Sequence, residues 1–242
     1  MRRSTNETLQ VASWGDRLAK RILLGEVDPE FVIGVLEPYA SERRQTRLKQ
    51  VFAQRISNVT MVLDALHDPH NGAALLRTSE ALGLARVHVV ERGESFLAHA
   101  GVARGTHKWV QVSAHPTAAE CVETLRQSGH ALVATHPQGE LVPQDLANVE
   151  RIALVLGNEH EGIAPEIRAA CTHSVRVPQR GFAESLNVSV CGGILLAYAT
   201  EHRAGDLSPG EQRRLYARGL AVTVPNAAAL LERADGPRAD DT

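Results

Sequence analysis

Two short strand-like runs with a helical segment between them decide the expected fold: Val59–Asp64 (VTMVLD) and Arg86–Val90 (RVHVV). Both runs are apolar and rich in β-branched residues, as in strands that are buried on both faces. Apolar residues between them recur at helical spacing over 71–82, and Gly83 is expected to end that helix. The segment from 59 to 90 therefore predicts a strand–helix–strand unit.

The same alternation continues along the chain. Further apolar runs predict strands at 109–112, 131–135, 152–156 and 174–177. Helices are expected at 117–127, 164–170 and 187–202, and a loop at 91–108. Strands that alternate with helices predict an α/β fold, with a mainly parallel sheet covered by helices on both faces.

Helical extensions are expected at both ends of this core, which we place at 58–203. Within 1–57, residues 1–40 are expected to be weakly structured or to form a short helix that Gly25 stops, and 41–55 are expected to form an amphipathic helix. In the tail, 204–242, Ser208-Pro209-Gly210-Glu211 is a capping box, so a helix is expected from there to about Gly219. A second tail helix is expected over 226–233, and 235–242 are expected to fray.

Composition excludes several classes of protein. The chain has 242 residues, of which 43% are hydrophobic and 22% charged, as in ordinary soluble globular proteins. No apolar run approaches the ~18 residues of a membrane span, and the N-terminus lacks a signal peptide's apolar stretch. The three cysteines lie far apart, so we expect reduced thiols in a cytoplasmic protein.

A net charge of −2 argues by itself against a nucleic-acid-binding protein, but the charge is unevenly distributed. Between residues 41 and 58, one acid opposes five basic residues: Arg43, Arg44, Arg47, Lys49 and Arg55. Such a segment is either an RNA-binding extension or a solvent-exposed helix face.

Three polar segments each lie at the C-terminal edge of a predicted strand, which is where ligands of open parallel sheets usually bind. The first, at 69–78, holds Asn71 at the expected N-cap and Arg77 six residues later. The alternative is a capping asparagine and a surface arginine. The second, 156–163 (LGNEHEGI), brackets acids with glycines; His160 has no second histidine at ligand spacing, so no metal is expected.

The third segment, 177–190, opens the long apolar helix, with Ser185 or Asn187 as its N-cap. Gly192 and Gly193 lie inside that helix, where each costs roughly 1 kcal/mol relative to alanine. They indicate either close packing or a flexible spot without a role.

Taken together, NxxxxxR, GNEHEG and PxxGxxxSLNVSV resemble the three motifs of the SPOUT-class (SpoU/TrmH-type) RNA ribose 2′-O-methyltransferases, over about 58–203. His67-Asp-Pro-His-Asn71, Thr106-His-Lys-Trp-Val110 and Ala134-Thr-His136 are similar to segments of the TrmH branch, the tRNA guanosine-2′-O-methyltransferases. The chain departs from the family pattern at 179–184 and 191–193.

The resemblance implies a C-terminal trefoil knot, a homodimer and S-adenosylmethionine as cofactor, with no metal. It implies tRNA as the substrate, methylated at guanosine 18 of the D-loop. The implied catalytic set is Arg77, Asn71, Glu159, Ser185 and Asn187. The cofactor is expected against the backbone near Thr135, His136, Leu156, Gly157, Val177 and Leu186. RNA contacts are expected from the five basic residues above and from Lys108.

Two other functions remain open from the sequence. The chain either methylates ribosomal RNA or another tRNA position, or is a non-catalytic RNA-binding relative of these enzymes. The intact residues Asn71, Arg77, Glu159, Ser185 and Asn187 favour an enzyme over a binding protein. A Rossmann dehydrogenase is disfavoured because no glycine fingerprint follows the first strand.

Overall fold

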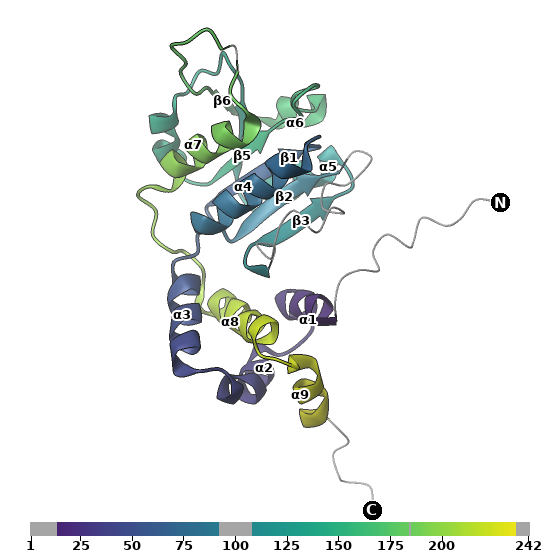
Figure 1. The fold of residues 1–242 in the computed structure, drawn as a ribbon. Coiled ribbons are helices and arrows are strands. Elements are labelled where there is room, and N and C mark those ends of the chain that lie inside the picture. Colours follow the sequence, from purple (N-terminus) through teal and green to yellow (C-terminus); the bar gives the residue numbers. More distant parts are fainter. Residues whose placement is uncertain (1–13, 92–107, 184, 236–242) are drawn as a thin grey trace, which may run out of the picture. The chain divides into compact units, whose positions relative to one another are not determined.

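The computed structural model describes residues 14–91, 108–183 and 185–235, which divide into two compact units (Figure 1). We call 55–206 the sheet unit. The described residues before and after it, up to Gln54 and from Leu207, form the helical unit. The described parts of the two helical extensions, which lie at opposite ends of the sequence, thus belong to one unit. Within the described residues, no helix combines the length and apolarity that a membrane crossing requires.

The sheet unit contains six strands in the order β3-β2-β1-β5-β4-β6, and every neighbouring pair is parallel. Their bounds are β1 Val59–Asp64, β2 Arg86–Val90, β3 Gln111–His115, β4 Ala131–Thr135, β5 Ile152–Leu156 and β6 His173–Val175. The predicted parallel sheet is confirmed, and four of the strands have the predicted bounds.

The bounds of the other two strands were wrong. β3 begins at Gln111, the residue that pairs with the first residue of β2, while 108–110 form a turn before it. β6 ends at Val175, which pairs with the last residue of β4. Val177 therefore lies beyond the ladder. In both cases the partner strand sets the bound, and the sequence of the strand itself does not show its partner. The predicted loop 91–108 falls almost wholly outside the described residues.

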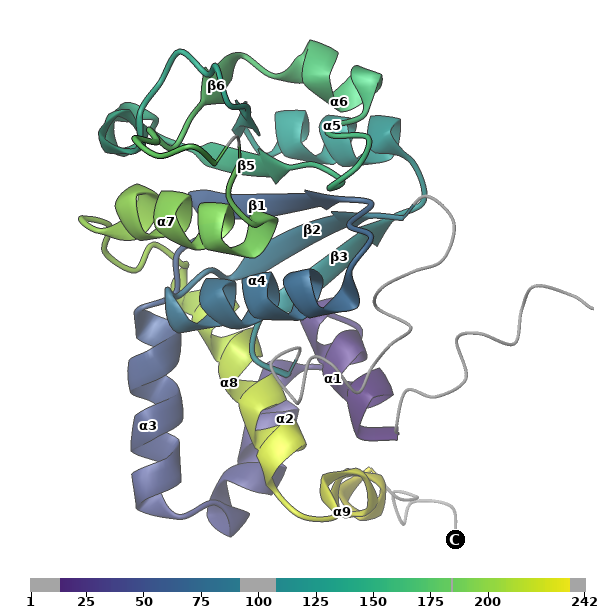
Figure 2. The same ribbon diagram turned by 45° about the horizontal axis from the view of Figure 1, so that its top comes forward.

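Helices cover both faces of the sheet (Figure 2). α4 (Pro69–Ala81) and α7 (Val188–Thr200) pack on one face, where Leu75, Leu76 and Leu195 join the larger core. α5 (Ala118–Gln127) and α6 (Pro165–Ala170) pack on the other, in a second core that includes Cys121 and Ile167. A 3₁₀ segment, η4 (Pro143–Asn148), contacts α7.

The first turn of α4 differs from the prediction. Asp68 is the N-cap and accepts a hydrogen bond from the His70 amide at 2.8 Å, and Pro69 occupies the first helical position. Asn71 therefore lies inside the first turn, where its side chain is free for other contacts. The helix ends as predicted, at Gly83, whose φ is +85°.

The strand order reverses between β1 and β5. The chain runs outward through β2 and β3, then crosses over to build β4, β5 and β6 on the other side of β1. In open α/β sheets such a reversal leaves a crevice outside the carboxyl ends of the two central strands. The segments that follow Asp64 and Leu156 border that crevice.

The helical unit is built around α8 (Pro209–Thr223), which contacts each of its other α-helices. These are α1 (Trp14–Leu23), α2 (Pro29–Leu36), α3 (Glu42–Ala53) and α9 (Ala227–Ala234), with a 3₁₀ turn, η1 (Glu37–Tyr39), after α2. The capping box of Ser208 and Glu211 is confirmed. The helix passes through Gly219 because that glycine faces α3: a Cβ there would lie 3.0 Å from Phe52 and 3.1 Å from Leu48.

Candidate active site

A chain of side-chain hydrogen bonds joins all three sequence motifs at the β1–β5 crevice. Asn71, in α4, donates from Nδ2 to Oε1 of Glu159 at 2.7 Å. Asn187, the N-cap of α7, donates from Nδ2 to Oδ1 of Asn71 at 3.0 Å. Asn71 is buried, whereas Glu159 and Asn187 are exposed. The chain therefore runs from a buried amide to two polar groups at the surface.

Glu159 is held as a carboxylate. Partial burial acts to raise its pKa, but hydrogen bonds from the Asn71 side chain and the His67 amide outweigh burial, so the pKa lies below its usual value. The His67 amide donates to Oε2 at 2.9 Å, and Asn71 occupies Oε1, so each carboxylate oxygen has a donor. An ionised carboxylate at this place can accept a hydrogen bond or balance a positive charge, but cannot donate a proton.

Two further hydrogen bonds fasten the loop after β5 to the end of β1. Asn158 donates from Nδ2 to the carbonyl of Ala65 at 2.6 Å, and the Ala164 amide donates to the buried carboxylate of Asp64, also at 2.6 Å. Gly157 permits the turn, because a Cβ there would lie 2.4 Å from the backbone of Gly162. These contacts hold the loop that carries Glu159 against the end of β1.

Arg77 lies six residues beyond Asn71 on α4, about 1.7 turns along the helix. Its side chain is exposed and has no hydrogen-bond or ion-pair partner among the described residues. Ser185 is likewise exposed. The structure therefore brings Asn71, Glu159 and Asn187 into contact. Arg77 and Ser185 are exposed, and each lies within six residues of a member of this hydrogen-bonded chain in the sequence.

Five of the six expected cofactor residues lie at or just beyond the ends of three neighbouring strands, in the sheet order β5-β4-β6. Thr135 is the last residue of β4 and Leu156 the last of β5; His136 and Gly157 come directly after them, and Val177 lies two residues after β6. Leu186, 36% exposed, lies just before α7. These loops present backbone groups and carboxylates without the lysine of a phosphate-binding loop. Their chemistry therefore fits an adenosine-bearing cation better than a nucleoside polyphosphate.

The segment after β4 packs against the chain that leaves β6. The His136 amide donates to the Val175 carbonyl at 3.0 Å, and the Leu141 amide donates to the Ser174 carbonyl at 2.9 Å. A Cβ at Gly139 would lie 2.4 Å from the Val175 carbonyl carbon. The two loops that would enclose a cofactor are therefore in direct backbone contact.

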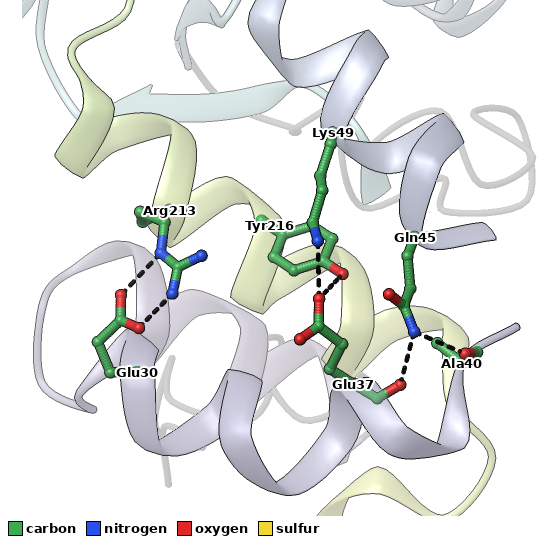
Figure 3. Close-up of polar contacts among 7 residues, drawn as sticks. All are labelled: Glu30, Glu37, Ala40, Gln45, Lys49, Arg213 and Tyr216. Carbon is green, nitrogen blue, oxygen red and sulfur yellow. Dashed lines mark hydrogen bonds and ion pairs between the residues drawn. The ribbon is translucent and has the colours of Figure 1, made fainter. Parts of the chain in front are cut away.

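The expected RNA-contacting residues fall into three groups. Arg43, Arg44 and Arg47, which we call the α3 arginines, are exposed, as is Lys108. Lys49 is exposed but engaged: its Nζ donates to Glu37 at 2.8 Å and lies 4.8 Å from the ring centre of Tyr216 (Figure 3).

Arg55 contradicts its expected role. Its side chain is only 2% exposed, forms an ion pair with Glu80 at 2.7 Å and donates to the carbonyl of Leu84 at 3.2 Å. It is therefore a buried structural residue and cannot reach an RNA phosphate. The basic run in the sequence did not distinguish it from its exposed neighbours, because its partners lie more than 20 residues away.

Sequence reasoning missed two supporting residues, Asp64 and His67. Asp64 is fully buried at the end of an apolar strand, and an acid in such a position was the available signal. His67 acts through its backbone amide, which no residue type reveals.

Comparisons with known proteins agree with this geometry. The model of the SpoU rRNA Methylase family matches residues 58–197. The tRNA (guanosine(18)-2′-O)-methyltransferase of Escherichia coli (strain K12) is 31% identical over 186 residues, 73% of this chain and 81% of that one. The crystal structure of the A. aeolicus TrmH/SpoU tRNA modifying enzyme has a TM-score of 0.66 and 28% identity, over 74% of this chain and 95% of that one.

A third relative carries the cofactor. It is the AdoMet-bound rRNA methyltransferase from Sinorhizobium meliloti, with a TM-score of 0.55 and 25% identity, over 64% of this chain and 60% of that one. The family match covers more than half of the chain, and it includes every member of the Asn187–Asn71–Glu159 hydrogen-bond chain. The protein therefore belongs to the SpoU rRNA Methylase family.

Proposed function

We propose that this protein methylates the ribose 2′-hydroxyl of guanosine 18 in the D-loop of tRNA. The observation that carries the proposal is the hydrogen-bonded chain of Asn187, Asn71 and Glu159, which gathers three distant motifs at the sheet's crevice. Relatives named tRNA (guanosine(18)-2′-O)-methyltransferase at about 30% identity support the choice of RNA and nucleotide. Ribosomal RNA is the second candidate, since other similar chains act on it by name.

S-adenosylmethionine is the cofactor, as in the AdoMet-bound relative. When bound, it supplies an activated methyl group on a positively charged sulfur. We place it against the backbone that follows β4, β5 and β6, at Thr135, His136, Leu156, Gly157, Val177 and Leu186. The ionised carboxylate of Glu159, held by Asn71, is suited to shape the polar side of the same pocket. Ser185 and Asn187 complete the pocket at the start of α7.

Arg77 is proposed to bind an RNA phosphate and to orient the ribose hydroxyl. A guanidinium stays protonated in proteins, so it is a poor general base. Its fork of donors suits a phosphate, and alignment of the hydroxyl with the methyl group accounts for a large part of such a transfer. The proton of the hydroxyl then leaves to a phosphate oxygen or to water.

We also propose that the chain forms a trefoil knot. After β6 the chain must return from the far side of β4 to α7, which packs against α4 and β5. The backbone contact between the 136–141 segment and residues 174–176 supports a passage of one loop through the other. Resistance of this region to complete extension by a pulling force is expected of a knotted chain.

We propose that two copies of the chain form a homodimer through the exposed side of α7 and the residues just before it. Leu186, Val190 and Tyr198 leave 36%, 50% and 38% of their surfaces exposed, although α7 is an apolar helix. Burying such side chains is favourable at about 25 cal/mol per Å². Light scattering at micromolar concentration is expected to give twice the 26.2 kDa chain mass; the chain mass itself would count against the dimer.

The substrate is tested by transfer of tritium from labelled S-adenosylmethionine to RNA. We expect label in unmodified tRNA transcripts and none in a transcript with 2′-deoxyguanosine at position 18. Label that persists in the deoxy transcript would move the target to another nucleotide. Label only in ribosomal RNA would favour the second candidate, and no label in either would indicate a non-catalytic RNA-binding protein.

The role of Arg77 is tested by Arg77→Lys. We expect the turnover number to fall by on the order of 10²-fold or more, with S-adenosylmethionine binding nearly intact, because lysine lacks the guanidinium's paired donors. The matched control is Arg126→Lys, since Arg126 is also an exposed helical arginine of the sheet unit, on α5. Near-normal turnover in the Arg77 variant would remove this residue from the mechanism.

A further inference from the structure

Three side chains that can ligate a soft metal ion lie together in the interior of the sheet unit, on the face that α5 covers. His88 in β2, His115 in β3 and Cys121 in α5 are 3%, 8% and 0% exposed. The donor atoms of all three side chains lie within 4.8 Å of one another. Among the described residues, this is the one group of three or more such side chains with the spacing of a metal site.

The parallel register of β2 and β3 explains why His88 and His115 lie side by side. Val90 pairs with His115, and His88 is two residues before Val90, so the two imidazoles project from the same face of the sheet. Nδ1 of His88 and Nε2 of His115 are 2.8 Å apart, and the planes of the two rings are nearly parallel, at 15°. Cys121, on the helix that covers this face, adds a free thiol.

We propose that His88, His115 and Cys121 bind one zinc-class divalent metal ion through His88 Nδ1, His115 Nε2 and Cys121 Sγ. Imidazole nitrogen and thiolate sulfur are the ligands of zinc and of similar transition metals, whereas magnesium and calcium take oxygen ligands. Since β2, β3 and α5 carry none of the catalytic candidates, the ion is structural and takes no part in methyl transfer.

The distances require only small movements of side chains. Two zinc–nitrogen bonds of about 2.0–2.1 Å at a tetrahedral angle place the nitrogens about 3.3 Å apart. The present 2.8 Å separation is that of a hydrogen bond, so the rings open by about half an ångström. A sulfur at about 2.3 Å from the metal lies about 3.6 Å from each nitrogen, so Cys121 turns inward from a separation of at most 4.8 Å.

The protonation states of the three side chains determine how many protons the metal displaces. Burial lowers the pKa of His88 to about 3, so that ring is neutral and keeps a lone pair. The proton that the two rings share moves to an outer ring nitrogen when the metal takes its place. Burial and Asp64 raise the pKa of the Cys121 thiol to about 12, so the metal must displace that proton, which passes to solvent. Binding therefore releases one proton per ion.

Titration of the untagged, metal-free full-length chain with Co²⁺ tests the proposal. We expect one ion per chain and a thiolate-to-cobalt charge-transfer band that zinc abolishes by competition. The band should be lost in Cys121→Ser and kept in Cys171→Ser and Cys191→Ser, which are matched controls because each removes one free thiol elsewhere. A band that survives Cys121→Ser, or no stoichiometric binding to the wild type, would overturn the site.

X-ray absorption of the zinc-loaded wild type makes the test independent of any variant's folding. One sulfur at about 2.3 Å and nitrogens at about 2.0–2.1 Å are expected in the first shell. A shell of oxygen and nitrogen alone would refute the assignment. Zinc should also raise the melting temperature of the wild type and not that of His115→Gln, while the turnover number at low temperature stays the same with and without zinc.

Discussion

Replacing Gly192 by alanine tests how tightly α7 is fitted against the sheet. A Cβ at this position would lie 2.5 Å from Cδ2 of Leu75 and 2.8 Å from Cδ1 of Leu156. Carbon atoms in contact are normally about 3.5–4.0 Å apart, so each leucine must retreat by about an ångström. Both leucines are fully buried in the larger core, where packing leaves little room for them to move.

The adjacent glycine provides a control within the same helix. A Cβ at Gly193 would find no neighbour closer than Cγ2 of Thr78, at 3.9 Å. Gly193→Ala should therefore gain helix propensity of about 1 kcal/mol without a clash. Gly192→Ala gains the same propensity but overpacks the core at a cost of about 1–3 kcal/mol. The difference between the two variants isolates that cost.

Urea unfolding measures the free energy of each variant by linear extrapolation, at two protein concentrations so that a dimer contribution is visible. We expect Gly193→Ala to be the more stable variant by about 1–3 kcal/mol. The turnover number of Gly192→Ala should also fall, because a displaced α7 carries Asn187 away from Asn71. Equal stabilities of the two variants would refute the close fit.

Three further expectations concern RNA, metal and acid. Replacing the α3 arginines together by glutamine should weaken tRNA binding and lower the slope of log affinity against log salt by about 2–3, since each phosphate contact contributes about 0.7–0.9; an unchanged slope in filter binding places the RNA contacts elsewhere. Methyl transfer at low temperature should survive a chelator when monovalent salt keeps the RNA folded, because the sulfonium needs alignment and no Lewis acid. Activity that is lost to the chelator while circular dichroism shows a folded protein, and that zinc or magnesium restores, contradicts this. Hydrogen bonds from Lys49 and Tyr216 lower the pKa of Glu37 in the folded protein below its ordinary 4.5. As the pH falls below 4.5, the Glu37 carboxylate is therefore protonated in the unfolded chain before it is protonated in the folded one, and the free energy of unfolding should fall. Urea unfolding across a pH series should show a smaller fall in Tyr216→Phe, and an equal fall would remove this network from the acid response.

The sequence determined those features that depend on neighbours along the chain. The runs at 59–64, 86–90, 131–135 and 152–156 are strands with the predicted bounds, because short β-branched apolar runs between turn residues have one favourable state. The tail helix begins at its capping box because Ser208 and Glu211 satisfy each other's backbone amides locally. The three polar segments were identified for the same reason: each follows a strand or opens a helix.

Tertiary structure decided what those residues do. Arg55 and the α3 arginines share one basic run, yet Arg55 is buried because Glu80 and the Leu84 carbonyl approach it from distant parts of the chain. Asp68 is the N-cap of α4, a position that Asn71 was expected to occupy. The Asn71 side chain can therefore donate a hydrogen bond to Glu159, 88 residues away.

Distant contacts also decided which parts of the chain form a unit. The described helices before and after the sheet unit form one unit because Gly219 on α8 packs against Phe52 and Leu48, which precede that unit in the sequence. His88, His115 and Cys121 meet only through strand register and the helix that covers them. Local pattern fixes a residue's backbone state, because the neighbours that set it are adjacent in sequence. A side chain's partner is set by the packing of segments far apart, which only the folded chain brings together.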